Sequence, residues 1–227
     1  MLEVNHLEKK FSEKKGIFDM TFTLQPGEIT ALLGRNGSGK TTLINCMLSL
    51  LKQDYGVVLL DDKEVSQQLE KVALISANLS SISYMSVDDY GHFLEQYYPA
   101  FQFEDYKAIL RDLKISSDGV ISSLSKGDQM KVELAAGFAM HAKVLLLDEP
   151  FTNLDIYAKE DAIKHLLAQV QEDVIILVAT HDIDEIEGIA DRCLILDEGK
   201  LVDDFYLDAL HEEGLELKQY LQKYRPE

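Results

Sequence analysis

The sequence predicts an α/β fold in which helices cover a parallel sheet. From residue 144 onward, short apolar stretches alternate with amphipathic ones, which is typical of strand–helix units. Upstream, the apolar stretch ITALL at 29–33 leads into the glycine-rich segment GRNGSGKTT at 34–42, and an amphipathic helical stretch follows to residue 52. These two observations place a buried strand, a glycine-rich loop and a helix in that order within the predicted fold.

The N-terminal part predicts antiparallel sheet instead. Residues 2–5 and 19–33 alternate in the manner of strands, and Gln25-Pro26-Gly27-Glu28 interrupts the second stretch. Pro-Gly pairs mark turns. Further strands are expected at VVLLD (57–61) and VALIS (72–76). We therefore expect an antiparallel β portion that leads into the buried strand before the glycine-rich loop.

Residues from about 79 to 142 predict an inserted helical subdomain. Three helical stretches, VDDYGHFLEQYY, EDYKAILRDL and GDQMKVELAAGFAMH, are separated by Pro99 and by serine-rich breaks. We expect one domain over 1–227 that contains this insert. After the insert we expect the strand VLLLD (144–148), the helix YAKEDAIKHLLAQV, the strand VIILVAT, the helix IDEIEGIA, the hairpin CLILDEGKLV and the short amphipathic tail helix GLELKQYLQKY, which is either a packed cap or a dimer contact.

Charge and composition limit the classes of molecule that this protein can bind. The 227 residues carry a formal net charge of -18, from 22 basic and 40 acidic side chains. Such a surface repels nucleic acid and anionic lipid, so we expect no nucleic-acid partner and a membrane contact only through a protein. No apolar run approaches the roughly 20 residues of a membrane helix, and the N-terminus lacks an apolar signal region. Cys46 and Cys193 lie in apolar stretches, which predicts buried, reduced thiols and a cytoplasmic location.

The glycine-rich segment matches the phosphate-binding pattern G-x-x-x-x-G-K-[ST]. Glycines let backbone N–H groups turn toward phosphate oxygens, and the following helix directs its positive end at the same anion. The lysine is expected to reach the β- and γ-phosphates, and the threonine after it to hold Mg²⁺. The candidate nucleotide-binding residues are Gly34, Asn36, Gly37, Ser38, Gly39, Lys40, Thr41 and Thr42.

A pair of acidic residues follows a second buried strand. VLLLDEP ends in Asp148 and Glu149, and ligands of doubly wound sheets bind beyond the carboxyl ends of strands. We expect Asp148 to support the Mg²⁺ shell together with Thr41. Glu149 is the candidate general base that polarises the attacking water.

The order of further motifs resembles the ATPase subunit of ABC (ATP-binding cassette) transporters. LSKGDQ at 124–129 lies between the phosphate loop and the acidic pair, TNLD at 152–155 follows the pair, and His181 follows VIILVAT. The resemblance covers essentially the whole chain and implies a RecF-like P-loop NTPase core with an N-terminal antiparallel β portion and an inserted α-helical subdomain. It also implies ATP and Mg²⁺ as ligands and hydrolysis of ATP coupled to transport.

The family's residue roles carry over by position. Ser125 and the backbone at Gly127 should cap the γ-phosphate bound to another copy, so activity should need a dimer. Asp155 should lie at that dimer interface, and His181 should contact the γ-phosphate, although a plain surface-loop histidine is the alternative. Phe11 either stacks on adenine or is an ordinary core phenylalanine.

The chain departs from the family pattern in two places. Lys126 and Asp128 replace the usual glycine and glutamine of the signature; Lys126 adds positive charge near the partner's phosphates, whereas Asp128 opposes it. Ala77 occupies the slot of a glutamine that touches Mg²⁺ and senses the membrane subunit. Either Asn78 substitutes for it with a shift of one residue, or a water fills the ligand position. The glutamines at 67 and 68 precede the strand and cannot take this role.

The stretch from residue 80 to 106 narrows the resemblance to small exporter ATPases of Gram-positive bacteria, such as those for phenol-soluble modulins, acetoin or bacitracin-type antibiotics. Four of its aromatic residues either form a groove for the membrane partner or pack inward: Tyr97, Tyr98, Phe101 and Phe103.

The expected function is a transport ATPase on the inner face of the membrane, bound to an integral membrane subunit, as a homodimer or a heterodimer with a sister ATPase. The alternatives are a soluble ABC-type ATPase and a non-hydrolysing ATP-binding regulator.

Overall fold

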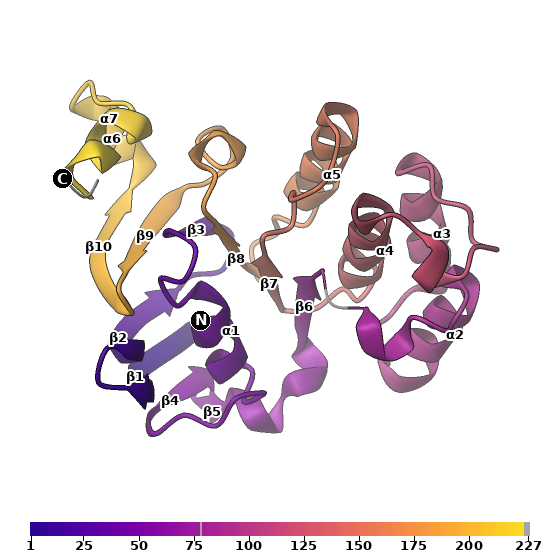
Figure 1. Cartoon of the computed structure of the whole chain (residues 1–227), viewed down its shortest axis with the longest axis horizontal. Coiled ribbons are helices and arrows are strands. Elements are labelled where there is room, and N and C mark those ends of the chain that lie inside the picture. The colour runs from indigo at the N-terminus through magenta and orange to yellow at the C-terminus, as the bar shows by residue number, and fades with distance from the viewer. Residues whose placement is uncertain (78, 225–227) are drawn as a thin grey trace. The chain divides into compact units, whose positions relative to one another are not determined.

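The computed structural model describes residues 1–77 and 79–224 (Figure 1). The chain divides into two compact units. The first unit comprises Met1–Gln68 and Ile175–Glu227, and the second comprises Leu69–Val174. Asn78, the candidate substitute for the family's glutamine, lies outside the described residues.

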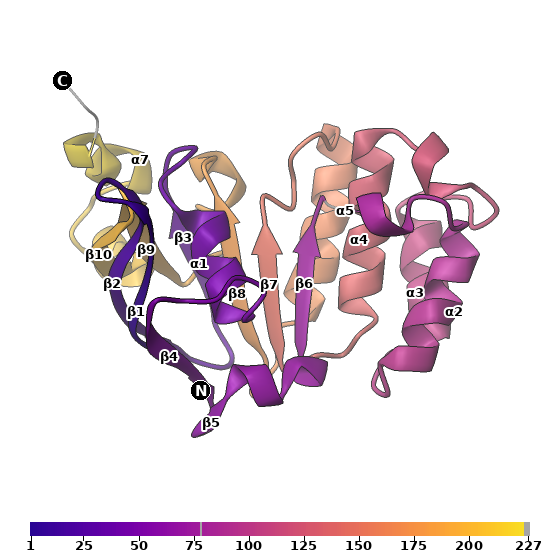
Figure 2. The ribbon, with the colours of Figure 1, turned by 60° about the horizontal axis from the view of Figure 1, so that its bottom comes forward.

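The first unit contains a largely parallel group of strands (Figure 2). β3 pairs in parallel with β8 on one side and with β9 on the other, and β10 joins β9 antiparallel. Every residue of β3 and β8 is buried, as expected for central parallel strands that are covered on both faces. Leu33 lies opposite Thr180 and Ile195, so β3 and β8 end at the same level and β9 continues to Asp197. The bounds are β3 (Ile29–Leu33), β8 (Ile175–Thr180), β9 (Arg192–Asp197) and β10 (Lys200–Tyr206).

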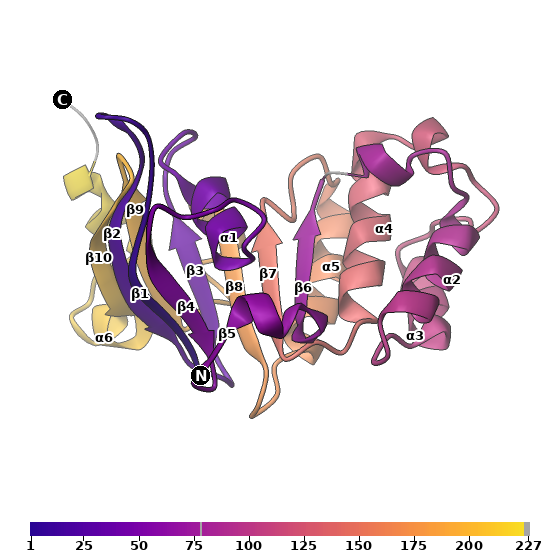
Figure 3. The same cartoon turned by 90° about the horizontal axis from the view of Figure 1, so that it is seen from below.

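The same unit carries the expected antiparallel sheet (Figure 3). Its strand order is β2-β1-β4-β5. Pro26 and Gly27 lie between β2 and β3, so the predicted turn divides the stretch 19–33 into strands of two different sheets. The bounds are β1 (Leu2–Ser12), β2 (Lys15–Leu24), β4 (Tyr55–Leu60) and β5 (Lys63–Glu64).

The second unit combines a parallel strand pair with helices. β6 pairs with β7, and Ser76 lies opposite Asp148 at their carboxyl ends. Helices α2, α3 and α4 pack against one another (Figure 1), and α4 also packs on β6. Gly137 allows this approach, because a Cβ there would lie 2.2 Å from the Ile75 side chain. The bounds are β6 (Val72–Ser76), α2 (Val87–Tyr97), α3 (Phe103–Asp112), α4 (Lys126–Phe138), β7 (Val144–Asp148) and α5 (Ile156–Ala168).

Three predicted helices differ from the structure. Helix α1 (Lys40–Met47) is shorter than predicted, because the chain turns at Ser49, whose φ is 56°. The stretch predicted as a helix at 183–190 forms only the 3₁₀ turn Ile183–Glu185; Asp182 caps this turn, and Gly188 is a poor helix former. The tail, predicted as one helix, divides into α7 (Leu217–Tyr220) and the 3₁₀ turn Leu221–Tyr224.

The tail packs against its own unit, together with α6 (Leu207–Glu212). Leu217 is fully buried, and Asp203 of β10 accepts hydrogen bonds from the Tyr220 and Tyr224 hydroxyls and from Lys223 Nζ. This arrangement supports the packed-cap interpretation of the tail. No helix within residues 1–77 and 79–224 has the length and apolar character needed to cross a lipid bilayer.

Both cysteines are free and buried, as predicted. Burial raises the pKa of the Cys46 thiol to about 11 and that of the Cys193 thiol to about 12. The thiols therefore remain protonated and serve as small apolar side chains in the core.

Candidate functional site

The glycine-rich loop joins the end of β3 to the start of α1, as the sequence predicted. Gly37 and Gly39 have φ values of 85° and 115°, a region that side-chain-bearing residues rarely adopt. Gly34 is required for a different reason, since a Cβ there would lie 2.4 Å from the Leu196 carbonyl oxygen. Glycine at these positions lets the loop curl tightly between β3 and α1.

Two neighbouring segments hold the loop in place. The Gly34 N–H donates to the Thr180 carbonyl at the end of β8 (3.4 Å), and the Gly199 N–H donates to the Ser38 carbonyl (2.8 Å). His181 directly follows Thr180, so the strand that anchors the loop also carries the candidate histidine. A loop fixed at both ends presents its backbone N–H groups without a large ordering cost when an anion binds.

Lys40 and Ser38 indicate that the loop suits an anion. Lys40 is almost fully buried, and its ammonium donates to the carbonyl oxygens of Gly34 (2.6 Å) and Arg35 (3.4 Å), so the cation links two residues of the loop. The Ser38 hydroxyl is buried and has no hydrogen-bond partner within the described part of the chain. A buried donor without a partner, next to a helix N-terminus and a cation, fits a phosphate oxygen.

A cavity of about 740 Å³ opens beside the loop, within the range of small-molecule sites. Phe11 lines it and is 59% exposed, so the interpretation of Phe11 as a core residue is wrong. The Lys9 ammonium lies 6.0 Å from the centre of the Phe11 ring. Sequence reasoning missed the basic residues of this cavity, although the run EKK at the turn between β1 and β2 gave a signal for two of them. These residues are Lys14, Lys15 and Lys200.

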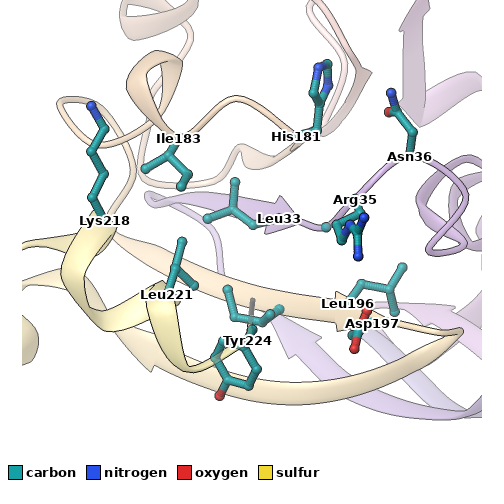
Figure 4. A pocket seen from close by; sticks show the side chains of 12 residues that line it. Leu33, Arg35, Asn36, His181, Ile183, Leu196, Asp197, Lys218, Leu221 and Tyr224 are labelled. Atoms are coloured by element: carbon teal, nitrogen blue, oxygen red, sulfur yellow. The ribbon is translucent and has the colours of Figure 1, made fainter. Parts of the chain in front are cut away.

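A second cavity, of about 570 Å³, lies on another side of the loop (Figure 4). It brings Asn36 and His181, both predicted site residues, to one cavity together with Arg35. His181 extends from the end of β8 beside the loop (Figure 4). Lys218 and Tyr224 of the tail line the same cavity. This could not be predicted from sequence, because these residues are distant from the loop along the chain.

The acidic pair ends β7 in the second unit. Asp148 is the last residue of the strand, and Glu149 follows with a φ of 52°. A left-handed backbone at a residue with a Cβ costs roughly 1–2 kcal/mol, and such strain is concentrated at functional sites. Asn153 has a φ of 66°, so the segment after the strand turns sharply twice before α5 begins.

Asp155 has a local role that the sequence analysis did not assign. Its carboxylate accepts hydrogen bonds from the N–H groups of Tyr157 (3.0 Å) and Ala158 (2.9 Å) and so caps α5. Ile156 and Tyr157 behind it are largely exposed. Asp155 therefore fixes where the TNLD segment joins the helix.

The signature segment packs on the TNLD segment within the second unit. Ser125 is the N-cap of α4, and a Cβ on Gly127 would lie 2.5 Å from the Asn153 carbonyl oxygen. Gln129 donates to the carbonyls of Ile121 (3.1 Å) and Leu124 (3.2 Å), which fixes the chain entering the helix. Two motifs that the sequence placed about 25 residues apart are thus brought into contact.

The glutamine slot after β6 holds Ala77, which is exposed and carries no polar group. Gln68 is buried and donates to the Leu60 carbonyl (2.9 Å), in agreement with the expectation that it cannot take the role. Sequence reasoning missed Glu133, a buried carboxyl group on α4 that accepts from the Ser76 N–H and the Tyr90 hydroxyl (3.3 Å). Its only signal was an acidic residue within the apolar stretch of α4.

The aromatic residues of the insert do not behave alike. Phe101 is buried against Tyr106, with ring centres 5.7 Å apart, whereas Tyr97 is 61% exposed at the end of α2. Tyr98 and Phe103 are half-buried. The aromatic stretch therefore contributes to the core of the second unit and also to its surface.

The phosphate loop, the signature helix start and the acidic pair define the chain as an ATP-binding cassette ATPase. Residues 17–152, more than half of the chain, match the family model described as ABC transporter. The chain belongs to the ABC transporter family and is the ATP-binding and ATP-hydrolysing subunit of such a transporter.

Curated relatives in sequence and one solved structure match nearly the whole length of this chain. The chain is 29% identical to the SkfA peptide export ATP-binding protein SkfE of Bacillus subtilis (94% of this chain, 92% of the relative). It is 32% identical to the phosphonates import ATP-binding protein PhnC 1 of Natronomonas pharaonis (95% and 97%). The solved structure of an ATP binding subunit of an ABC transporter superposes with a TM-score of 0.87 at 23% identity (99% of this chain, 100% of that chain). The predicted fold class is confirmed.

Proposed function

We propose that two copies of this chain, or this chain and a sister ATPase, close around two ATP molecules and drive a separate integral membrane subunit. The buried Ser38 hydroxyl near the Lys40 cation has no hydrogen-bond partner among the described residues, and this observation supports phosphate binding at the loop most directly. Ser125 at the start of α4 supplies the second contact, from the other copy. An ATP bound from two sides makes hydrolysis depend on closure of the dimer.

The residues divide the work on ATP. Lys40 and the loop N–H groups, with Asn36, Gly37, Gly39 and Thr42, bind the phosphates and pre-align the γ-phosphoryl group. Glu149 accepts a proton from the attacking water as the new oxygen–phosphorus bond forms and the bond to the β-phosphate oxygen breaks, which leaves ADP and inorganic phosphate. His181 donates to the γ-phosphate and Phe11 stacks on adenine.

The proposed Mg²⁺ ligands are the hydroxyl of Thr41, the carboxylate of Asp148 and phosphate oxygens. Hydroxyl and carboxylate oxygens are the hard ligands that Mg²⁺ prefers, and Mg²⁺ in phosphoryl-transfer sites takes only one or two protein carboxylates. Among the residues described, no group of three or more His, Cys, Asp or Glu side chains is placed so that it could hold a metal ion. The ion would offset the negative charge that develops on the phosphates.

The proposed cargo is a peptide or antibiotic-like molecule, and the proposed direction is export from the cytoplasm. The likeness to a relative named for peptide export supports this, together with the sequence resemblance of residues 80–106 to small exporter ATPases. A relative named for phosphonate import is at least as similar along the chain, so a direct test decides the direction. The chain's net charge of -18 favours attachment through a protein partner rather than through lipid.

The test of the ATPase cycle uses purified protein with Mg-ATP. Phosphate release per mole of chain should rise with protein concentration, because only the dimer hydrolyses ATP. Glu149→Gln should abolish release but retain ATP and accumulate dimer. Turnover per chain that does not change with dilution would contradict the shared site, and full turnover in Glu149→Gln would contradict the general-base role.

The test of export uses the chain expressed together with the integral membrane subunit that co-purifies with it. Inverted membrane vesicles expose the ATPase to the outside medium, so an exporter should take up a labelled peptide from that medium only when ATP is added. ATP-dependent loss of preloaded peptide from such vesicles would show import instead. Vesicles that contain the same membrane protein together with the Glu149→Gln variant of this chain are the control for passive leakage.

A further inference from the structure

The Ser125 hydroxyl is engaged inside its own chain. Ser125 Oγ accepts a hydrogen bond from the Asp128 N–H (3.1 Å) and lies 2.8 Å from Asp128 Oδ2. Burial opposes ionisation of Asp128, but the hydrogen bonds from Ser125 and Lys131 outweigh it, so the pKa of this carboxyl is below its usual value. The carboxylate thus has no proton to give, and the single hydroxyl proton of Ser125 is donated to Asp128.

We propose that Asp128 competes with the terminal phosphate of ATP for the Ser125 hydroxyl and so limits how tightly two copies close on ATP. This inference rests on the proposed role of Ser125. A hydroxyl group has one proton, which it can donate either to Asp128 or to a phosphate oxygen. The carboxylate also brings negative charge to the helix start that receives the phosphate, and like charges repel.

Lys131 sets the strength of this competition. Its ammonium lies 3.0 Å from Asp128 Oδ1 and its side chain is mostly buried, so it offsets part of the carboxylate charge. Lys126, the other departure near the signature, instead donates to Gln129 (3.3 Å). Removing the Lys131 charge should therefore loosen the closed dimer, whereas removing the Asp128 charge should tighten it.

The chain contains a matched control for a purely structural explanation. Helix α2 begins with the same arrangement, in which Ser86 Oγ accepts from the Asp89 N–H (3.0 Å) and donates to Asp89 Oδ2 (2.7 Å). In both pairs the serine caps the helix by accepting from the N–H three residues on, which stabilises the helix start. Asp89→Asn therefore removes the same kind of local interaction at a helix start that has no assigned phosphate.

The experiment measures ATP-dependent dimerisation in a Glu149→Gln background, which is expected to retain ATP. The dimer dissociation constant is obtained by light scattering at saturating Mg-ATP. It is measured for the parent and for four variants that each add one substitution to the parent: Asp128→Asn, Lys131→Gln, Asp89→Asn and Ser125→Ala. Asp128→Asn removes one negative charge near each of the two ATP sites of the dimer. The dimer dissociation constant should therefore fall at least about fivefold for this variant. Lys131→Gln should raise the constant, and Asp89→Asn should leave it at the parent value.

The outcomes separate this inference from the proposed function. Dimerisation that is lost in Ser125→Ala, tightened in Asp128→Asn and unchanged in Asp89→Asn supports the competition. An unchanged or weaker dimer in Asp128→Asn, with Ser125→Ala still disruptive, overturns the competition alone. No ATP-dependent dimer in the parent contradicts the homodimeric form of the proposed function and the inference with it, and no effect of Ser125→Ala contradicts the proposed role of Ser125 and the inference. ATP affinity of the dilute monomer should be equal in all variants; a change in Asp128→Asn there would also count against the competition.

Discussion

Gly127 of the signature and Asn153 of the TNLD segment are in direct backbone contact, since a Cβ on Gly127 would lie 2.5 Å from the Asn153 carbonyl oxygen. The glycine is thus required by packing as well as by the phosphate it is proposed to approach. Asn153 itself has a left-handed backbone, with a φ of 66°. A shift of either segment must therefore be accommodated by the other.

Gly127→Ala should impair hydrolysis more than stability. The added methyl group must displace the Asn153 carbonyl, and such overpacking costs about 1–3 kcal/mol. We expect steady-state ATPase activity to fall at least about tenfold, because displacement of a shared site by an ångström carries a penalty of that order or more. Gly119→Ala is the control, since a Cβ there meets its nearest neighbour at 3.6 Å. Equal activity in both variants would contradict the packing argument.

Ser38→Ala should stabilise the ATP-free protein and weaken ATP binding. The substitution removes a buried hydroxyl that has no hydrogen-bond partner among the described residues, which costs about 1–3 kcal/mol to bury. Urea unfolding without nucleotide should therefore show a higher free energy of unfolding for the variant. Equilibrium titration with Mg-ATP should show a higher Kd. A variant with lower stability and unchanged ATP affinity would show that the hydroxyl does not serve the phosphate.

Phe11→Ala should raise the Kd for ATP without changing stability. The ring is 59% exposed, so its removal leaves no core cavity, whereas stacking of a base on an aromatic ring contributes about 1–3 kcal/mol. We expect roughly a tenfold rise in Kd, because 1.4 kcal/mol corresponds to a factor of ten. Phe11→Tyr should restore binding. Competition with inorganic triphosphate separates the roles, since its affinity should be the same in all three proteins.

Glu133 should make stability fall as the pH rises. Burial raises the pKa of this carboxyl to about 8, despite the opposing hydrogen bonds from Tyr90 and Ser76, whereas in the unfolded chain the pKa has its ordinary value of 4.5. Between these two pKa values the folded state binds more protons than the unfolded state, so the free energy of unfolding decreases with pH, by at most about 1.4 kcal/mol per pH unit. Above pH 8 both states have lost the proton and this contribution is constant.

Glu133→Gln tests that assignment. A glutamine keeps the shape and does not titrate, so denaturant midpoints measured from pH 5 to 9 should fall less steeply for the variant than for the parent. The difference between the two proteins should level off above about pH 8. Parallel curves over the whole range would show that Glu133 does not titrate between these limits.

Local patterns were sufficient for the parts of the fold that depend on neighbouring residues. The strands VALIS and VLLLD, the turn at Pro26-Gly27 and the loop between β3 and α1 all lie where the pattern placed them. Periodicity failed at 183–190, where apolar spacing suggested a helix but the chain forms a single 3₁₀ turn. A short amphipathic stretch does not form a helix without packing support, since helical stability comes largely from tertiary contacts.

The sequence by itself determined the class of the protein and the identity of its phosphate loop, because glycine, lysine and helix-start chemistry act over a few consecutive residues. Only the tertiary structure decided that Gly127 packs on Asn153, that Glu133 reaches Ser76, and that the tail lines a cavity with His181. It also decided that Phe11 is exposed. Contacts between residues distant along the chain depend on how the elements pack, and composition and spacing do not encode that packing one residue at a time.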